Sequence, residues 1–189
     1  METIRENVVS AEVKNYKVDT NESIVNWHGK KVLGQHNGTV KITEGNILVK
    51  DNKVTGGKVK VDISTLESLD LVGDEKTKAM LEGHLKSDDF FNAEKFPDIT
   101  FVINSVEESS EKNSDHVVTG DLTIRDVTKT LSFPGKISVN ELKLTAEIEA
   151  DIDRTDFGLK YGSGKFFAGL GDNLISDKFS IRIHIIAAV

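Results

Sequence analysis

The sequence has 189 residues of which 38% are hydrophobic, enough to form the core of one domain and too few for two. Its formal net charge of -7 opposes non-specific binding to nucleic acid, because phosphate contacts need clustered Lys and Arg. The chain contains no cysteine, which excludes a disulfide framework and a thiol nucleophile.

Residues 1–14 are polar and lack the basic start and the apolar stretch of an intact signal peptide. We expect them to form a flexible N-terminal tail, part of which could pair as an extra strand, and residues 15–189 to form one domain. The longest uninterrupted apolar run, 185–189, is far shorter than the roughly 18 residues that indicate a membrane span. The sequence therefore predicts no transmembrane segment.

Apolar and polar residues alternate with a period of two, which is typical of β-strands. The pattern is strongest over 142–152, where six apolar residues alternate with charged residues and a threonine. In chain order, the predicted strands are 24–29, 38–42, 47–50, 59–63, 99–103, 117–124, 131–139, 142–152 and 179–185. The chain should therefore contain about eight or nine strands.

Short polar segments at 44–46, 51–53 and 139–141 separate neighbouring strands and predict hairpin turns. Most neighbouring strands should accordingly pair antiparallel. The segment 64–96 interrupts the alternation, and helix formers within it predict a short helix over 74–85. Ser87, followed by two acidic residues, predicts the N-cap of a second helical turn.

Many alternating strands with one helical excursion fit either a closed barrel or a two-layer sandwich, and the pattern alone does not separate the two. Closure into a barrel would remove the unpaired edges that invite aggregation. A barrel of about eight strands has an interior just large enough to be filled by side chains or to hold one ligand.

Known motifs for metal and nucleotide binding are absent from the sequence. The acidic run at Asp151, Asp153 and Asp156 lacks the Gly and Glu that an EF-hand loop needs at its sixth and twelfth positions. No dinucleotide fingerprint or nucleophile elbow occurs, and the five histidines are too scattered to predict a metal site. We expect no cofactor and no metal.

Two groups of polar residues allow more than one interpretation. His84 lies close in sequence to Asp88 and Asp89, which suits either an acid–base pair or an ordinary polar helix end. Arg154 could bind an anionic head group with its planar guanidinium, or only neutralise neighbouring carboxylates across a turn. Phenylalanines gather in the same loop-like segments, where they would cap the core or line the mouth of a ligand cavity.

Four segments resemble the YceI-like family: HLKSDDFF at 84–91, KFPDITF at 95–101, GDLTIRDVTK at 120–129 and IDRTDFGLKYGSG at 152–164. They occur in order, and the resemblance covers residues 16–188. It implies an all-β fold, an extended eight-stranded antiparallel lipocalin-like β-barrel with one or two short helices in the 64–96 insertion.

The resemblance further implies a protein that binds and carries a long-chain isoprenoid or other amphiphilic lipid, such as a prenyl quinone or polyprenyl compound, and that is not an enzyme. It implies the bacterial periplasm after removal of a signal peptide, although the missing export signal leaves the cytoplasm open. A homodimer is compatible with this reading.

The residues expected to contact the lipid form two sets. Inward-facing positions of the strands should contact the apolar tail: Val59, Val61, Ile99, Phe101, Leu142, Leu144, Ile148, Ile181 and Ile183. The resemblance places a second set at the mouth, near the head group: His84, Asp88, Phe90, Phe91, Arg154 and Phe157.

Two rival functions remain at this point. In the first, His84, Asp88 and Arg154 converge on the polar pocket of an enzyme. In the second, the protein is a structural or stress-associated module whose barrel is filled by its own side chains.

Overall fold

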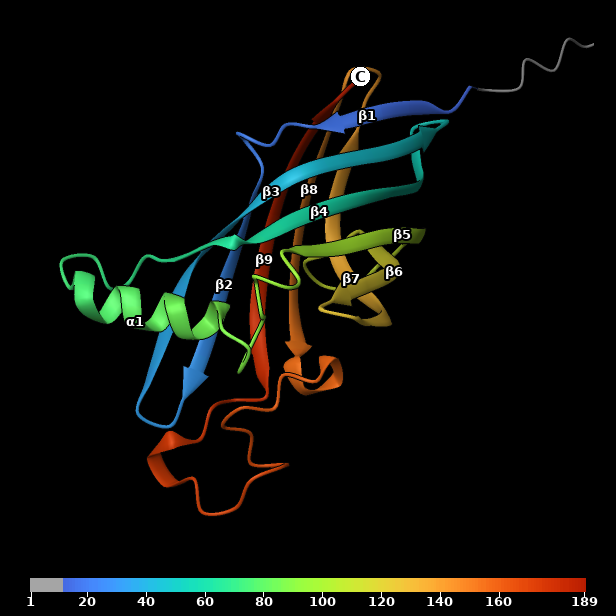
Figure 1. The fold of residues 1–189 in the computed structure, drawn as a ribbon. Helices are drawn as coiled ribbons and strands as arrows, with labels where there is room; N and C mark the ends of the chain where they lie inside the picture. Colours follow the sequence, from blue (N-terminus) through green and yellow to red (C-terminus); the bar gives the residue numbers. More distant parts are fainter. Residues whose placement is uncertain (1–11) are drawn as a thin grey trace, which may run out of the picture.

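The computed structural model describes residues 12–189 (Figure 1). The predicted tail 1–14 lies mostly outside these residues, and the first strand begins at Lys14. The strands are β1 (Lys14–Val18), β2 (Ile24–Lys31), β3 (Gly34–Lys50), β4 (Lys53–Ser68), β5 (Asp98–Glu108), β6 (His116–Ile124), β7 (Val127–Val139), β8 (Lys143–Asp153) and β9 (Lys178–Ala188). The helices are α1 (Glu75–Lys86) and two 3₁₀ turns, η1 (Arg154–Phe157) and η2 (Gly171–Asn173). None of the helices within residues 12–189 has the length and apolar character needed to cross a bilayer.

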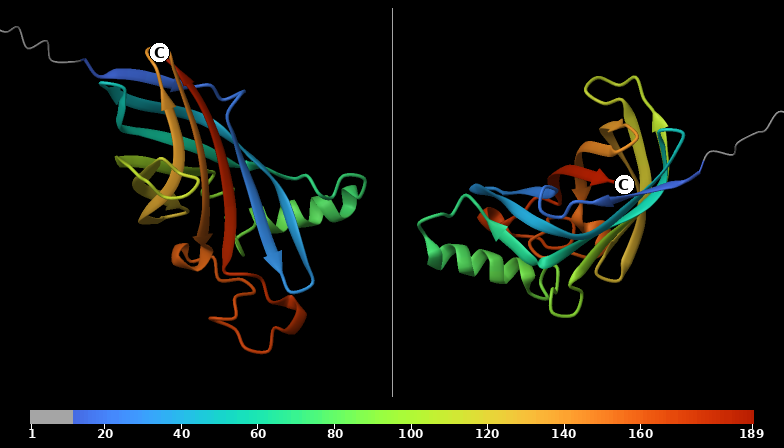
Figure 2. Two further views of the ribbon diagram at one scale, coloured as in Figure 1. Left: turned by 180° about the vertical axis from the view of Figure 1, so that it is seen from behind. Right: turned by 90° about the horizontal axis from the view of Figure 1, so that it is seen from above.

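The strands form a closed antiparallel barrel with eight positions around its wall (Figures 1 and 2). Each strand from β2 to β9 pairs with the next in the chain, and β9 pairs back with β2. β1 occupies the same position as β2, because both run between β3 and β9, at opposite ends of the barrel. Closure confirms the predicted eight-stranded barrel and excludes the two-layer sandwich.

β3 corrects one predicted turn. The polar segment 44–46 was expected to separate two strands, but β3 runs through it as one strand of 17 residues. The register of β3 against β4 shifts between Ile42 and Glu44, which marks a bulge rather than a hairpin. Gly45 stands here because a Cβ atom would lie 2.5 Å from the side chain of Val18 on β1. The glycine therefore marks a close approach of β1 and β3, and not a turn.

β4 continues to Ser68, beyond the point where the alternation of the sequence breaks at residue 64. The reason is a second bulge, between Thr39 and Lys41 of β3. There the hydroxyl of Thr65 accepts a hydrogen bond from the backbone N–H of Lys41 at 2.9 Å, in place of a regular ladder bond. The inserted residues change the periodicity without ending the strand.

The insertion contains one α-helix, in agreement with the helix predicted over 74–85. Asp74 is its N-cap and accepts a hydrogen bond from the backbone N–H of Thr77 at 3.1 Å. Ser87 was predicted to begin a second helical turn, but it is the C-cap of α1, and its hydroxyl donates to the carbonyl of His84 at 2.7 Å. The residues after Ser87 form hydrogen-bonded turns and no second helix.

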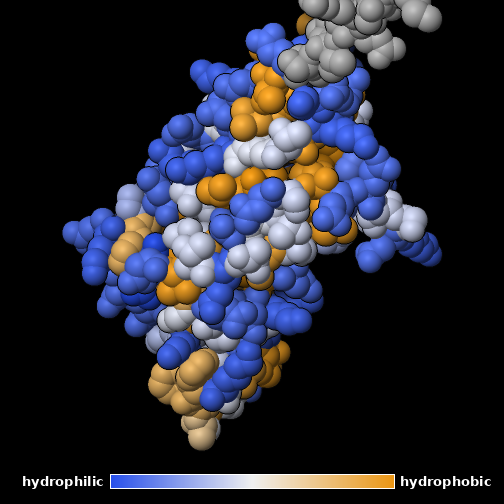
Figure 3. Space-filling model, turned by 90° about the vertical axis from the view of Figure 1, so that its right-hand side faces the viewer, coloured by the Kyte–Doolittle hydropathy of each residue, from blue (hydrophilic) through white to orange (hydrophobic). Residues whose placement is uncertain are grey.

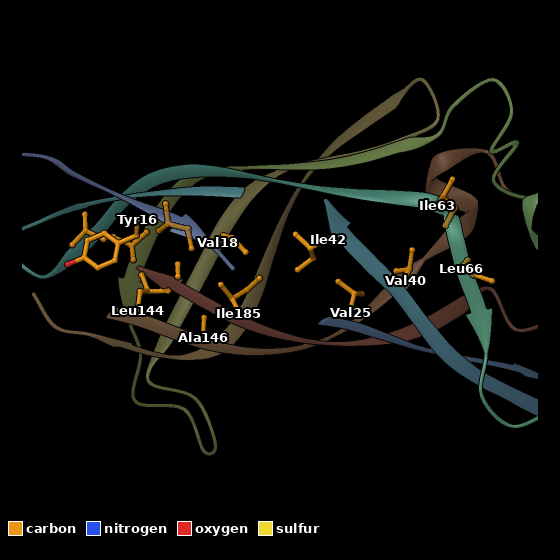
Figure 4. Packing of buried hydrophobic residues seen from close by; sticks show 14 of the residues in the cluster. Tyr16, Val18, Val25, Val40, Ile42, Ile63, Leu66, Leu144, Ala146 and Ile185 are labelled. Atoms are coloured by element: carbon orange, nitrogen blue, oxygen red, sulfur yellow. The ribbon is translucent and has the colours of Figure 1, made fainter. Parts of the chain in front are cut away.

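Buried apolar side chains pack along the inside of the barrel in two clusters, the first of which is drawn in Figure 4. One extends from Tyr16 and Val18 at the β1 end to Ile63 and Leu66. The other gathers around Phe90, Phe133 and Phe157, among other buried residues. Tyr16 is fully buried and its hydroxyl donates to the carbonyl of Asn140 at 2.6 Å, so β1 is anchored to the turn between β7 and β8 at its end of the barrel.

Candidate functional site

The barrel contains a cavity of about 240 Å³. All eight wall positions contribute to its lining, which is almost entirely apolar. Eight of the nine residues predicted to contact an apolar tail lie on this wall: Val59, Val61, Ile99, Phe101, Leu144, Ile148, Ile181 and Ile183. The barrel is therefore not filled by its own side chains.

Leu142 is the ninth residue, and its prediction is wrong. Its side chain is 75% exposed, and it lies in the turn before β8. The side-chain oxygen of Asn140 accepts hydrogen bonds from the backbone N–H groups of Leu142 and Lys143, at 3.0 and 2.8 Å. This turn ends the alternation one apolar position earlier than the sequence pattern indicates.

The polar residues of the lining gather at the end of the barrel opposite β1, which is the cavity mouth. They are Lys30 at the end of β2, Arg154 in η1, and Ser176 and Lys178 at the start of β9. Among the lining residues, Lys30 and Lys178 are the most exposed to solvent. No carboxylate of residues 12–189 belongs to the lining, so the formal charges of the lining residues are all positive.

Arg154 is buried at the mouth, where its guanidinium binds backbone carbonyl groups. Nε, Nη1 and Nη2 donate to the carbonyls of Ser176, Leu159 and Ile175 at 2.9, 2.6 and 3.1 Å. Burial lowers the pKa of Arg154, while the charges of Asp177 and Asp153 oppose that shift. Arg154 thus joins the two ends of the loop between η1 and β9, which neither sequence-based interpretation anticipated.

The structure does not bring His84, Asp88 and Arg154 together as an enzyme site would require. His84 Nε2 lies 3.1 Å from Oδ2 of Asp89, not of Asp88. The side chain of Asp88 is 83% exposed and accepts a hydrogen bond from Asn92 at 2.7 Å. Neither His84 nor Asp88 lines the cavity. Among residues 12–189, no three His, Asp or Glu side chains are grouped so that they could hold a metal ion.

The aromatic residues predicted at the mouth lie between α1 and the loop after η1. Phe90 and Phe91 line the cavity, whereas Phe157 is 2% exposed and packs in the cluster behind it. Phe90 packs against the rings of His84 and Tyr161, with centroids 5.1 and 5.5 Å away. His84 therefore has a packing role in an aromatic cluster at the mouth.

Several lining residues were not singled out from the sequence. Trp27 shares the inward face of β2 with Val25, so alternation within the predicted strand 24–29 could have identified it. It is the only tryptophan of the chain, which makes it a natural fluorescence reporter of the cavity. Lys30 and Lys178 carry no such signal, because they lie at strand ends that only the closed barrel brings together.

Comparison with known proteins identifies similar chains. The model of the YceI-like domain matches residues 16–187. A UPF0312 protein of Pseudomonas putida strain F1 is 32% identical over 155 residues, which cover 77% of this chain and 76% of that protein. A UPF0312 protein of Photorhabdus laumondii is 33% identical over 179 residues, covering 84% and 82%.

Solved structures with the same fold are more distant in sequence. BcnA of Burkholderia cenocepacia superposes with a TM-score of 0.69 at 22% identity, over 89% of this chain and 98% of BcnA. A polyisoprenoid binding domain from Saccharophagus degradans superposes with a TM-score of 0.66 at 12% identity, over 92% of this chain and 98% of that domain.

Proposed function

Because this chain belongs to the YceI-like domain family, we propose that its cavity binds a polyisoprenoid or another long-chain amphiphilic lipid and carries or stores it. The family match confirms the resemblance seen in the four sequence motifs. The observation that carries the proposal is the apolar cavity along the barrel, with polar residues only at its mouth. The domain from Saccharophagus degradans, described as polyisoprenoid binding, supports the same ligand class.

The apolar wall suits a lipid tail for a simple thermodynamic reason. Each buried CH₂ group gains about 0.8 kcal/mol relative to water, so a long tail does not cross an aqueous compartment unprotected. Relative to a bilayer, entry into the cavity changes the free energy of the tail little, since both surroundings are apolar. Binding can therefore be tight against water and still be reversible against a membrane.

The head group should remain at the mouth, near Lys30, Ser176 and Lys178. Arg154 is less suited to bind it, because its guanidinium already donates to three carbonyl groups. The proposed role is binding, and the rival enzyme site gains no support, because its three residues face different surroundings. We further propose an extracytoplasmic location, which the family resemblance supports and which cell fractionation of the native host would test.

Mass spectrometry of an organic extract from the gently purified protein, together with its native mass, tests this function. A stoichiometric prenyl quinone or polyprenyl lipid is the expected result. Lipid-free protein should then take up a supplied long-chain prenyl quinone and quench the fluorescence of Trp27 on the cavity wall. A quinone without the tail should bind far more weakly, because the tail supplies most of the buried apolar area.

Two phenylalanine substitutions on β5 provide a matched pair for this titration. Ile99 lies on the cavity wall, whereas Val102 is 40% exposed on the outer face of the same strand. Ile99→Phe should fill part of the cavity and weaken uptake of the lipid about tenfold or more, and Val102→Phe should leave it unchanged. Absence of lipid in the extract together with no uptake from solution would contradict the proposed function.

A further inference from the structure

Exposed apolar side chains gather at the mouth end of the barrel, on the loop between η1 and β9 and on the neighbouring β2–β3 hairpin. Figure 3 shows hydrophobic colour at the lower end of the molecule, where Figure 1 places this loop. We call this surface the apolar tip; it consists of Val32, Leu33, Tyr161, Phe166, Phe167 and Leu174, which are 37–71% exposed.

The hairpin and the loop form one continuous surface, because backbone hydrogen bonds join them. The N–H of Val32 donates to the carbonyl of Leu174 at 3.2 Å, and the N–H of Ser176 donates to the carbonyl of Lys30 at 2.8 Å. The loop is also held from within by the buried guanidinium of Arg154. These hydrogen bonds therefore hold the apolar tip in a fixed position at the mouth.

The loop exposes two phenylalanines beside a lysine whose ammonium group is paired with carboxylates, and large apolar side chains are not usually exposed side by side. Lys165 Nζ contacts Oδ2 of Asp153 at 2.6 Å and Oδ2 of Asp177 at 3.6 Å. The next two backbone N–H groups, of Phe166 and Phe167, both donate to the carbonyl of Ser163. Their side chains are left 47% and 50% exposed. Such an arrangement is typical of a surface that meets an apolar partner.

Charge distinguishes this end of the molecule from the rest. Segments 28–35 and 153–178 together contain six Lys or Arg and four Asp residues, in a chain that carries 24 basic and 31 acidic residues overall. Lys160 Nζ lies 4.6 Å from the centroid of the Phe166 ring, so a cation accompanies the exposed aromatic side chain. Aromatic rings with adjacent lysines are typical of segments that insert at the interface of a bilayer containing anionic lipids.

We propose that the apolar tip docks on the surface of a bilayer that contains anionic lipid, and that the docked protein exchanges long-chain lipid through the adjoining mouth. This inference rests on the proposed function, since the same loop supplies Leu159, Ile175 and Ser176 to the cavity wall. The uneven charge of the molecule would turn its mouth toward the negatively charged surface. Direct transfer then spares the tail from crossing water.

Flotation of the full chain with vesicles tests the docking. Vesicles of phosphatidylglycerol and phosphatidylethanolamine should carry the wild-type protein upward, and vesicles of phosphatidylcholine alone should carry less of it. The double variant Phe166→Ser, Phe167→Ser should bind the anionic vesicles about tenfold more weakly or worse. The matched control is Met80→Ser on α1, where a side chain that is 67% exposed lies outside the apolar tip, and its flotation should equal that of wild type.

Vesicle docking by the apolar tip and lipid uptake by the cavity can be measured separately. Quenching of Trp27 by a prenyl quinone presented in detergent should be unchanged in the double variant, whereas Ile99→Phe should lose quenching and still float with vesicles. Failure of all variants to take up lipid would overturn the proposed function only. Absence of wild-type flotation, or equal flotation of the double variant, would overturn the docking. A wild-type dimer that the double variant abolishes, with no vesicle binding, would assign the tip to a second copy and also overturn it.

Discussion

Arg154 shows how a charged residue at the mouth of a lipid cavity can be structural. The sequence places it between two acidic residues, which suggested a site for an anionic head group or a neutralising role. Three of its N–H groups instead satisfy carbonyls of the loop that forms the mouth. A carbonyl that leaves water without gaining a partner is costly, so the guanidinium allows the two ends of this loop to pack at the mouth without secondary structure.

Arg154→Ala should lower the free energy of unfolding by about 3 kcal/mol, because one buried and two partly buried carbonyl groups would lose their donor. Arg154→Lys should recover only part of the loss, since a single ammonium group cannot reproduce the planar fork of donors. Urea denaturation followed by Trp27 fluorescence measures both changes.

Arg182→Ala is the matched control for Arg154→Ala. Arg182 forms an ion pair with Glu149 at 2.6 Å, but both side chains are about two-thirds exposed. Its removal should change the free energy of unfolding by less than about 1 kcal/mol. Equal losses for Arg154→Ala and Arg182→Ala would show that the carbonyl contacts do not stabilise the loop.

Among the elements, β1 is the one whose role depends most on its position in the barrel. It is only five residues long and pairs with β3 and β9, the same two strands that flank β2 at the other end of the barrel. Its two buried side chains, Tyr16 and Val18, pack inside the end of the barrel that lies opposite the mouth. β1 therefore adds apolar packing to the end at which the cavity lining carries no charged residue.

Truncation of Tyr16 tests this packing. Tyr16→Ala should lower the free energy of unfolding by about 3–5 kcal/mol, because it leaves a large void where the buried ring packs. Tyr16→Phe removes only the hydrogen bond to the carbonyl of Asn140 and should lower it by about 1 kcal/mol. Differential scanning calorimetry of the lipid-free proteins compares the two, and similar losses in both would mean that packing of the ring contributes little.

For the molecule as a whole, stability should depend on carboxylates that the fold holds in their charged form. Burial alone would raise the pKa of Asp70, but hydrogen bonds with Asn37, His36 and Ser68 outweigh it and lower the pKa to about 2. The pKa of Asp153 is lowered in the same way, with burial outweighed by hydrogen bonds from Lys165 and Thr155. Such groups favour the folded state whenever they are ionised.

The direction of the pH effect follows from the lowered pKa. Above the ordinary value near 4 the carboxylate of Asp70 contributes its full stabilisation, and the contribution is lost as the pH falls from about 4 to about 2. Asp70→Asn should lower the free energy of unfolding at pH 7 by about 1–2 kcal/mol and reduce the further loss in acid. Urea midpoints measured between pH 7 and pH 2 test this.

Asp172→Asn, on the exposed turn η2, is the control for charge removal and should follow the wild-type curve. An Asp70→Asn variant whose midpoint falls in acid as steeply as that of wild type would show that Asp70 does not contribute to the acid sensitivity.

Much of the barrel could be read from the sequence, because the direction in which a strand residue points is a local property. Alternation predicted the strands, and eight of the nine residues expected on the inner wall do lie there. Two exceptions are places where another segment intervenes: Gly45 accommodates Val18, and Thr65 replaces a ladder bond. The third is local, because the turn at Asn140 leaves Leu142 outside.

By itself, the sequence determined the fold class, the family and the apolar face of each strand, since periodicity and motifs are carried by neighbouring residues. Only the tertiary structure decided where β1 packs, at which end the polar residues of the cavity lining gather, and that Arg154 binds carbonyl groups of the loop at the mouth. These features depend on residues that are distant in the chain, such as Tyr16 with Asn140 or Lys30 with Ser176. Their contacts exist only once the barrel closes, so no local pattern of residue types could reveal them.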